Sequence, residues 1–264
     1  MDEQEIQREK RAGVPAGVAA VGAMVLPVLA TVLPQLFVQG EPNGTRGVLR
    51  AIAENPAVFV AAGVLQGIGT ALIAWVYLYL YRATRARRPD TASVVGVVAL
   101  VGPLLLAGVL LANQLAVVDV ARTFAREGGD LAALLRDGPV GFIRTFAFSG
   151  TLALGIATLL VSLNAMKTGL LSRFLGALGI AIGVISALPF GGALPLQAFW
   201  LGALALLLLD RWPNGRGPAW AAGEPRPWPP SQRGGRRGVE APAPPEDEPA
   251  RPRPTSRKRR PRVR

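Results

Sequence analysis

The sequence predicts an all-α fold: a polytopic transmembrane helix bundle of about six spans, followed by a disordered basic C-terminal tail. Between Val14 and Leu209 the chain consists of long apolar stretches with almost no ionised side chain. These stretches lack the alternation of polar and apolar residues that marks a half-buried strand. Residues 210–264 are instead dominated by Pro, Gly and Arg. Two different environments are therefore expected for the two parts of this 264-residue chain.

The apolar stretches have the length that a bilayer requires. About 20 apolar residues, at roughly 1.5 Å per residue, cross a hydrocarbon core that is about 30 Å thick. We therefore expect a cytoplasmic N-terminal leader at residues 1–13 and a six-helix transmembrane domain at residues 14–210. The expected spans are residues 14–38, 57–81, 92–118, 145–166, 170–188 and 193–209.

The first stretch also raises the alternative of a cleaved signal peptide. Its roughly 25 apolar residues exceed the core of a signal peptide, which has about 7–15. Its leader, MDEQEIQREKRAG, mixes acidic with basic residues. We therefore interpret the stretch as a span, and cleavage near Val38 and Gly40 is the alternative.

The end of the second span, YLYLYRATRARRPD at residues 77–90, combines tyrosines with arginines. Its tyrosines and Trp75 are expected to form an aromatic collar at headgroup depth, because amphipathic rings favour that position. The arginines that follow are expected to bind anionic lipid, at about 1 kcal/mol each. These residues are Arg82, Arg85, Arg87 and Arg88.

Lys and Arg residues are distributed unequally between the two sides of the predicted bundle. If the spans alternate in direction, one side of the bundle receives the leader, the second and fourth connections, and the tail. Without the tail, this side has nine Lys and Arg residues. The opposite side receives six. Because positive charges in short connections favour the cytoplasm, both termini are expected there. The expected location is the cell (inner, cytoplasmic) membrane, as a multi-pass protein in contact with the lipid bilayer.

Residues 211–264 form the expected tail, because this segment offers too little apolar surface to offset the entropy of ordering it. Its terminal cluster, RPRPTSRKRRPRVR, is expected to bind anionic lipid, while RNA and other nucleic acid are less favoured partners. Trp212, Trp220 and Trp228 recur every eight residues. We expect Trp212 at the membrane interface and the other two against lipid or a partner.

Polar residues inside the apolar stretches define the candidate binding site. A cytoplasmic N-terminus places most of them in the outer halves of their spans. Because an unpartnered polar side chain in hydrocarbon is costly, buried amides face other helices or water. Two interpretations follow: an outward-facing polar vestibule, or hydrogen bonds between helices that stabilise the bundle. The vestibule residues are Gln66, Asn113, Gln114, Arg144 and Gln197.

Two further patterns concern contacts between helices. Arg144 and Asp119 lie at similar depth on the outer side, so we expect them to pair at the rim, where an ion pair stabilises little. Glycines four residues apart are expected to bring helices close together. Packing within one chain is the favoured interpretation, and a homo-oligomer interface is the alternative. The glycine pairs are Gly63 with Gly67, and Gly179 with Gly183.

The absence of His and Cys removes several classes of chemistry. An imidazole base, a thiolate nucleophile, haem ligation and a disulfide all need these side chains. None of the expected spans has an internal Asp or Glu, so the paired carboxylates of an intramembrane protease are missing as well. We therefore predict a non-enzymatic protein without cofactor or metal.

Three segments carry a resemblance to a known family. NAMKTGLLSRFLGALGIAIGVI, at residues 164–185, is a basic turn that leads into a glycine-rich helix. YRATRARRPD precedes the third span, and LLDRWPNGRGPAW follows the sixth. In these segments the chain resembles bacterial multi-pass membrane proteins of the domain-of-unknown-function 4386 type. The resemblance covers much of residues 14–228, implies a six-helix inner-membrane protein, and carries over no catalytic residue.

The sequence therefore predicts a membrane scaffold or adaptor with a basic tail at the inner leaflet. The alternative is a small-solute permease or transporter-like bundle, because six spans divide into two inverted halves of three. A permease requires a polar path from the outer amides to the inner face. A scaffold requires a closed core.

Overall fold

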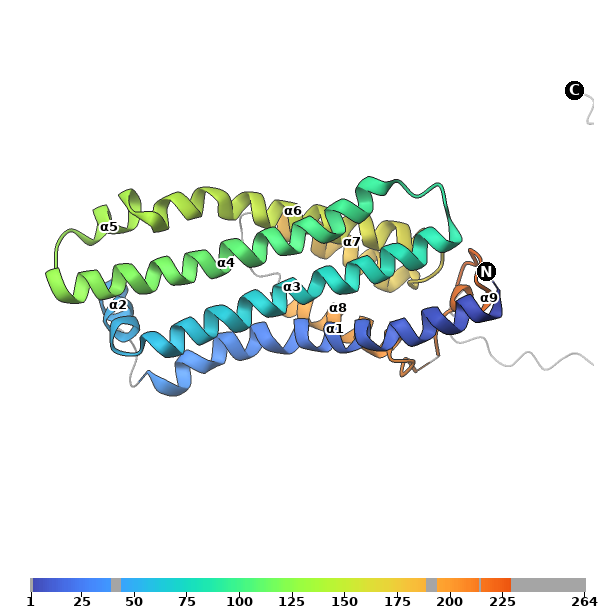
Figure 1. The fold of residues 1–264 in the computed structure, drawn as a ribbon, viewed down its shortest axis with the longest axis horizontal. Helices are drawn as coiled ribbons and strands as arrows, with labels where there is room; N and C mark the ends of the chain where they lie inside the picture. Colours follow the sequence, from blue (N-terminus) through green and yellow to red (C-terminus); the bar gives the residue numbers. More distant parts are fainter. Residues whose placement is uncertain (1, 39–43, 189–193, 214, 229–264) are drawn as a thin grey trace, which may run out of the picture. The chain divides into compact units, whose positions relative to one another are not determined.

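The computed structural model describes residues 2–38, 44–188, 194–213 and 215–228 (Figure 1). Throughout these ranges the regular structure is helical and no strand occurs, which confirms the predicted all-α fold. The helices in these ranges are α1 (Glu3–Phe37), α2 (Gly44–Glu54), α3 (Pro56–Arg87), α4 (Ser93–Glu127), α5 (Leu131–Asp137), α6 (Pro139–Lys167), α7 (Arg173–Ala187), α8 (Leu194–Leu208) and α9 (Pro218–Ala222).

Six of these helices pack in a ring (Figure 1). α1 packs against α3 and α8, α3 against α4, α4 against α6, and α6 against α7, while α7 closes the ring against α8. α3 also contacts α6 across the ring. The short helices α2 and α5 are both at one end of the bundle, where α2 packs on α4 and α5 on α6. Helices that are consecutive in the ring run in opposite directions, as in an up-and-down bundle.

Four helices have the length and composition to cross a membrane. They are α1, α3, α4 and α6, with 35, 32, 35 and 29 residues. The most apolar part of each has a mean hydropathy between 1.9 and 2.7. α7 and α8 are also apolar, but each has 15 residues, which is about 22 Å of helix. Four of the six expected spans therefore reach full transmembrane length.

The long helices extend beyond the apolar stretches. α1 begins inside the expected leader, because Asp2 and Glu5 form a capping box. The Asp2 carboxylate accepts from the Glu5 N–H at 2.7 Å, and the Glu5 carboxylate accepts from the Asp2 N–H at 3.2 Å. α4 continues to Glu127, past the expected end at residue 118, and α6 begins at Pro139 rather than at residue 145. Proline is favoured there because its missing N–H would be unpaired anyway.

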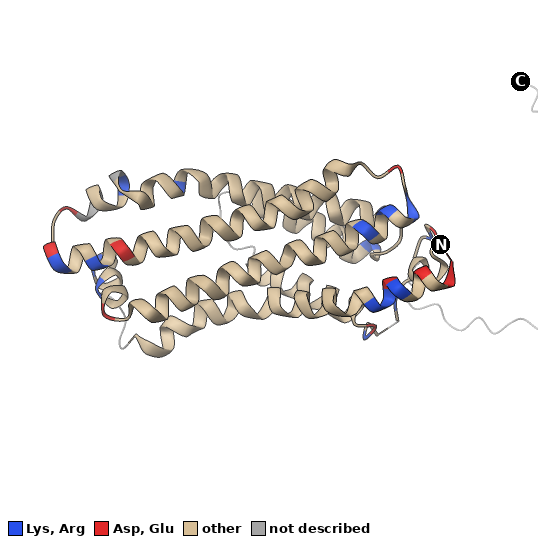
Figure 2. Ribbon diagram, in the orientation of Figure 1, with Lys and Arg blue, Asp and Glu red and all other residues tan. Residues whose placement is uncertain are grey.

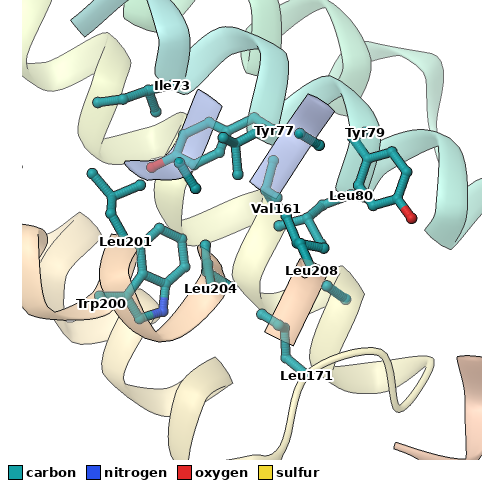
Figure 3. Packing of buried hydrophobic residues seen from close by; sticks show 14 of the residues in the cluster. Ile73, Tyr77, Tyr79, Leu80, Val161, Leu171, Trp200, Leu201, Leu204 and Leu208 are labelled. Carbon is teal, nitrogen blue, oxygen red and sulfur yellow. The ribbon is translucent and has the colours of Figure 1, made fainter. Parts of the chain in front are cut away.

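A core of fully buried side chains joins α3, α6 and α8 (Figure 3). Tyr77, Leu80, Trp200 and Leu204 are inaccessible to solvent. The Tyr77 hydroxyl lies 2.7 Å from the Thr158 hydroxyl, and its ring meets the Trp200 ring edge-on with 6.1 Å between centres. The buried hydroxyl therefore has a partner, and the aromatic pair fills the middle of the ring.

The expected aromatic collar is wrong for Tyr77 and Tyr79. Tyr77 is fully buried and Tyr79 is 7% exposed, whereas Trp75 is 57% exposed. The two tyrosines turn inward because their hydroxyl groups have partners inside the bundle. Tyr77 meets Thr158, and the Tyr79 hydroxyl donates to the Glu9 carbonyl oxygen at 3.1 Å.

α6 and α7 approach each other through glycine residues. A Cβ atom placed on Gly183 would lie 2.7 Å from the carbonyl oxygen of Gly155, and one on Gly155 would lie 2.5 Å from the carbonyl oxygen of Gly183. Gly179 faces the Ser162 side chain of α6 at a similarly close approach. Because these contacts lie within one chain, they support packing inside the bundle for the pair Gly179 and Gly183.

Charged residues gather at the two ends of the bundle (Figure 2). The N-terminus, the α3–α4 connection, the α6–α7 connection and the chain after α8 share one end, which we call the basic end. Its Lys and Arg residues are Arg8, Lys10, Arg11, Arg82, Arg85, Arg87, Arg88, Lys167, Arg173, Arg211, Arg216 and Arg226. The connections at the basic end are thus the ones that the sequence analysis placed on a single side of the bundle by alternating the direction of the spans.

Candidate functional site

Two of the five candidate residues, Gln66 of α3 and Gln197 of α8, line the same cavity near the middle of the bundle. The cavity has a volume of about 140 Å³. Thr70 lies one helical turn after Gln66 and also lines it, and its hydroxyl donates to the Gln66 carbonyl oxygen at 2.8 Å. The remaining lining residues are apolar and come from α1, α3, α4, α6 and α8.

The two glutamine side chains have unused hydrogen-bonding capacity. Neither carboxamide forms a hydrogen bond with another residue in the described part of the chain. Each carboxamide offers two donors and an acceptor. The stabilising interpretation of the sequence required Gln66 and Gln197 to form hydrogen bonds between helices. Neither side chain does so within the described residues.

Buried core side chains close the cavity on the side that faces the basic end. Ile73 and Leu201 line it and also belong to the buried core cluster. Tyr77, Trp200 and Leu204 continue this cluster toward the basic end and are fully buried (Figure 3). Apolar side chains therefore separate the cavity from the basic end within the described residues.

Asn113, Gln114 and Arg144 lie apart from the cavity. Gln114 covers Gly63 instead, and a Cβ atom on that glycine would lie 2.5 Å from its Cγ. Arg144 and Asp119 are both exposed, and within the described residues no ion pair joins them. The expected rim pair is therefore not formed. The structure brings together two of the five vestibule residues and separates the other three from them.

A second group of polar and aromatic side chains surrounds Trp220 of α9 at the basic end. Trp220 is 5% exposed, and its indole N–H donates to the Leu170 carbonyl oxygen at 2.9 Å. The guanidinium groups of Arg87 and Arg216 each lie 5.3 Å from its ring centre, and the Tyr79 ring stacks on it at 6.0 Å. We call this group the Trp220 cluster; its members are Glu9, Tyr79, Arg87, Arg216 and Trp220.

Arg87 ties three helices together inside the Trp220 cluster. Its Nη1 donates to the two carboxylate oxygens of Glu9 at 2.9 and 3.1 Å and to the Ala83 carbonyl oxygen at 2.9 Å. Its Nε donates to the Ala219 carbonyl oxygen at 2.9 Å. The Arg87 side chain is fully buried, and its Nη2 has no hydrogen-bond partner among the described residues. This arginine therefore joins α1, α3 and α9.

The predicted disordered tail is wrong for residues 211–213 and 215–228. Besides Trp220, the indole N–H of Trp228 donates to the Gly169 carbonyl oxygen at 2.7 Å, and the Arg226 N–H donates to the Thr168 carbonyl oxygen at 3.3 Å. These contacts hold the segment on the α6–α7 connection. Residues 229–264, the rest of the expected tail, lie outside the described residues.

The arginines expected to bind anionic lipid are not equivalent. Arg82 and Arg85 are exposed, while Arg88 is half-buried and pairs with Asp90 at 2.9 Å. The hydrogen bond from Arg88 lowers the pKa of Asp90 below its ordinary value. Arg87 is buried against Glu9, so it has no access to a lipid headgroup, and the expectation is wrong for this residue.

The fold and these two groups of side chains define a helical bundle with four helices of transmembrane length, as expected of a membrane-embedded protein. Within the described residues, no three acidic side chains lie together where they would hold a metal ion, and the chain contains no His or Cys. Comparison with protein-family models, with curated proteins and with solved structures finds no match.

Proposed function

We propose that this protein is a non-enzymatic scaffold or adaptor of the cell membrane that presents its basic segment, residues 229–264, at the inner leaflet. The observation that carries the proposal is the closed core between the cavity and the basic end. A permease needs a polar path across the bundle, whereas Ile73, Tyr77 and Trp200 are buried where such a path would run. A closed bundle is suited to act as an anchor.

In this proposal the six helices of the ring are six membrane spans, and both termini lie in the cytoplasm. α7 and α8 are shorter than the hydrocarbon core, and local thinning of the bilayer accommodates such helices at modest cost. The basic end faces the cytoplasm because its Lys and Arg residues favour that side.

The Trp220 cluster supports the role in presentation, because it determines where the chain leaves the bundle. Trp220 and Trp228 are held on the α6–α7 connection, so residue 228 lies at the basic end. The segment that follows, residues 229–264, contains eleven Lys and Arg against four Asp and Glu. Each basic residue close to an anionic leaflet contributes about 1 kcal/mol of attraction. The partner in this proposal is therefore a surface of anionic lipid.

Capture of anionic vesicles tests the proposal. Liposomes of neutral lipid that carry the full chain are expected to capture added vesicles rich in phosphatidylglycerol, measured by co-sedimentation of a fluorescent lipid in the added vesicles. Raising the salt from about 0.1 M to 1 M shortens the Debye length from about 10 Å to 3 Å and is expected to abolish the capture. Residues 1–228 alone, which keep the whole described bundle, are expected to show no capture.

The matched control is the full chain with the eight Lys and Arg residues of positions 251–264 replaced by Gln, which keeps the length of the segment. Its capture is expected to fall strongly. Equal capture by this variant and by the unaltered chain would show that the basic cluster is not the binding element, and the proposal would be abandoned.

The same liposomes test the permease alternative, which the amides of Gln66 and Gln197 in the cavity favour. A scaffold is expected to leave the rate of swelling in glycerol at the value of protein-free liposomes. Faster swelling that is abolished by Ala198→Phe, a substitution in the cavity wall, would establish the permease instead.

A further inference from the structure

We propose that the central cavity is a binding site for a small neutral amide. The unpaired polar side chains of the site come from two helices: the carboxamide of Gln66 belongs to α3 and the carboxamide of Gln197 belongs to α8. This inference goes beyond the scaffold role and does not depend on it, because a closed bundle can hold a ligand without conducting it.

The wall of the cavity contains hydrogen-bonding groups that lack partners. The carboxamides of Gln66 and Gln197 form no hydrogen bond with other described residues. Both glutamine side chains are half-buried among apolar residues, where a polar group without a partner is costly. A molecule that supplies these partners removes that cost.

The size and charge of the cavity restrict what can occupy it. Its volume of about 140 Å³ is close to that of an engineered cavity of roughly 150 Å³ that binds benzene, and below the 300 Å³ or so of a site for drug-sized molecules. None of its lining residues is ionisable. A charged molecule would therefore lose its hydration without gaining a counter-charge. The occupant is a neutral molecule of roughly benzene size.

An amide has the hydrogen-bonding groups that match this wall. Its NH₂ group donates to the side-chain oxygen of one glutamine, and its carbonyl oxygen accepts from the NH₂ group of the other. In the ring α1 lies between α3 and α8, so one ligand that contacts both Gln66 and Gln197 bridges these two helices. The apolar part of the ligand packs against Met24, Ile73 and Leu201.

Fluorine NMR with trifluoroacetamide as the probe tests this site. The full chain in lipid nanodiscs is expected to broaden the fluorine signal in a saturable manner, beyond the effect of empty nanodiscs. Loss of a neutral hydrogen bond weakens binding by a factor of about 2 to 10, so the double variant Gln66→Leu, Gln197→Leu is expected to bind about tenfold more weakly or worse. Gln35→Leu, at an exposed position outside the cavity, is the matched control and is expected to bind normally.

A third variant, Ala198→Phe, places a large side chain in the cavity wall and is expected to abolish binding. Circular dichroism checks that each variant is folded, and if Ala198→Phe does not fold, the glutamine double variant decides. Two results would overturn the inference. The first is no saturable broadening beyond that of empty nanodiscs, which is the result expected for a cavity that holds only water. The second is unchanged affinity in the double variant.

Discussion

Replacing Trp220 with alanine is expected to lower the free energy of unfolding by about 3–5 kcal/mol, the range for removal of large buried aromatic side chains. The substitution removes the ring that the guanidinium groups of Arg87 and Arg216 both contact, and it leaves the Leu170 carbonyl without its indole donor. Reversible unfolding of the full chain in mixed micelles, followed by circular dichroism, measures the loss.

Trp75→Ala is the matched control for Trp220→Ala. Trp75 is 57% exposed on the surface of the bundle, so its loss is expected to change the free energy of unfolding by about 0.5 kcal/mol or less. If the two alanine variants lost equal stability, Trp220 would not be a buried anchor, and the docking of residues 215–228 on the bundle would be wrong.

Replacing Arg87 with methionine is also expected to cost about 3–5 kcal/mol, because it leaves the carboxylate of Glu9 largely buried without its counter-charge. The double variant Glu9→Leu, Arg87→Met is expected to recover most of this loss, since it removes both charges and keeps apolar volume. The free energy of unfolding is measured for the two single variants and the double variant, which completes a double-mutant cycle.

The exposed Arg82 provides the control for Arg87. Arg82→Met is expected to leave stability within about 0.5 kcal/mol of the unaltered chain. A double variant that loses as much as the sum of its two single variants would contradict the pairing of Glu9 with Arg87. Because Arg87 and Trp220 contact each other, the losses from Arg87→Met and Trp220→Ala are not expected to add.

The long helices could be predicted from the sequence because uncharged apolar stretches of about 20 residues have few other structures available. Their ends could not be predicted in the same way. α1 starts at Glu3 because of a local capping box, and α4 continues to Glu127 after its apolar stretch has ended. Hydropathy reports the solvent around a helix, whereas caps and contacts with neighbouring helices determine where it begins and ends.

The candidate residues of the cavity show the same limit. Gln66 and Gln197 stand out because amides are rare in apolar stretches, so the sequence identified them. Whether the two side chains line the same cavity depends on how α3 and α8 are rotated about their axes, and this rotation cannot be predicted from the sequence. Gln114 was equally conspicuous, but it lies over Gly63 and not in the cavity.

The Trp220 cluster was not predicted, because the high proline and arginine content of residues 211–264 indicated a disordered segment. The available signal was the presence of three tryptophans in a polar segment, at positions 212, 220 and 228. Their partners include the backbone carbonyls of Gly169 and Leu170, which carry no side-chain signature. The sequence does not distinguish Arg87 from its exposed neighbours either, because its partner Glu9 is 78 residues away in the chain.

Cysteine labelling measures most directly whether this chain is a membrane-spanning bundle with its basic end in the cytoplasm. The chain has no native cysteine, so Thr45→Cys in α2, Ser93→Cys at the start of α4 and Ser231→Cys can be labelled one at a time without background. With a membrane-impermeant maleimide on intact cells, only Thr45→Cys is expected to react, and the other two only after permeabilisation. Labelling of Ser93→Cys in intact cells, or equal labelling of all three, would contradict the account.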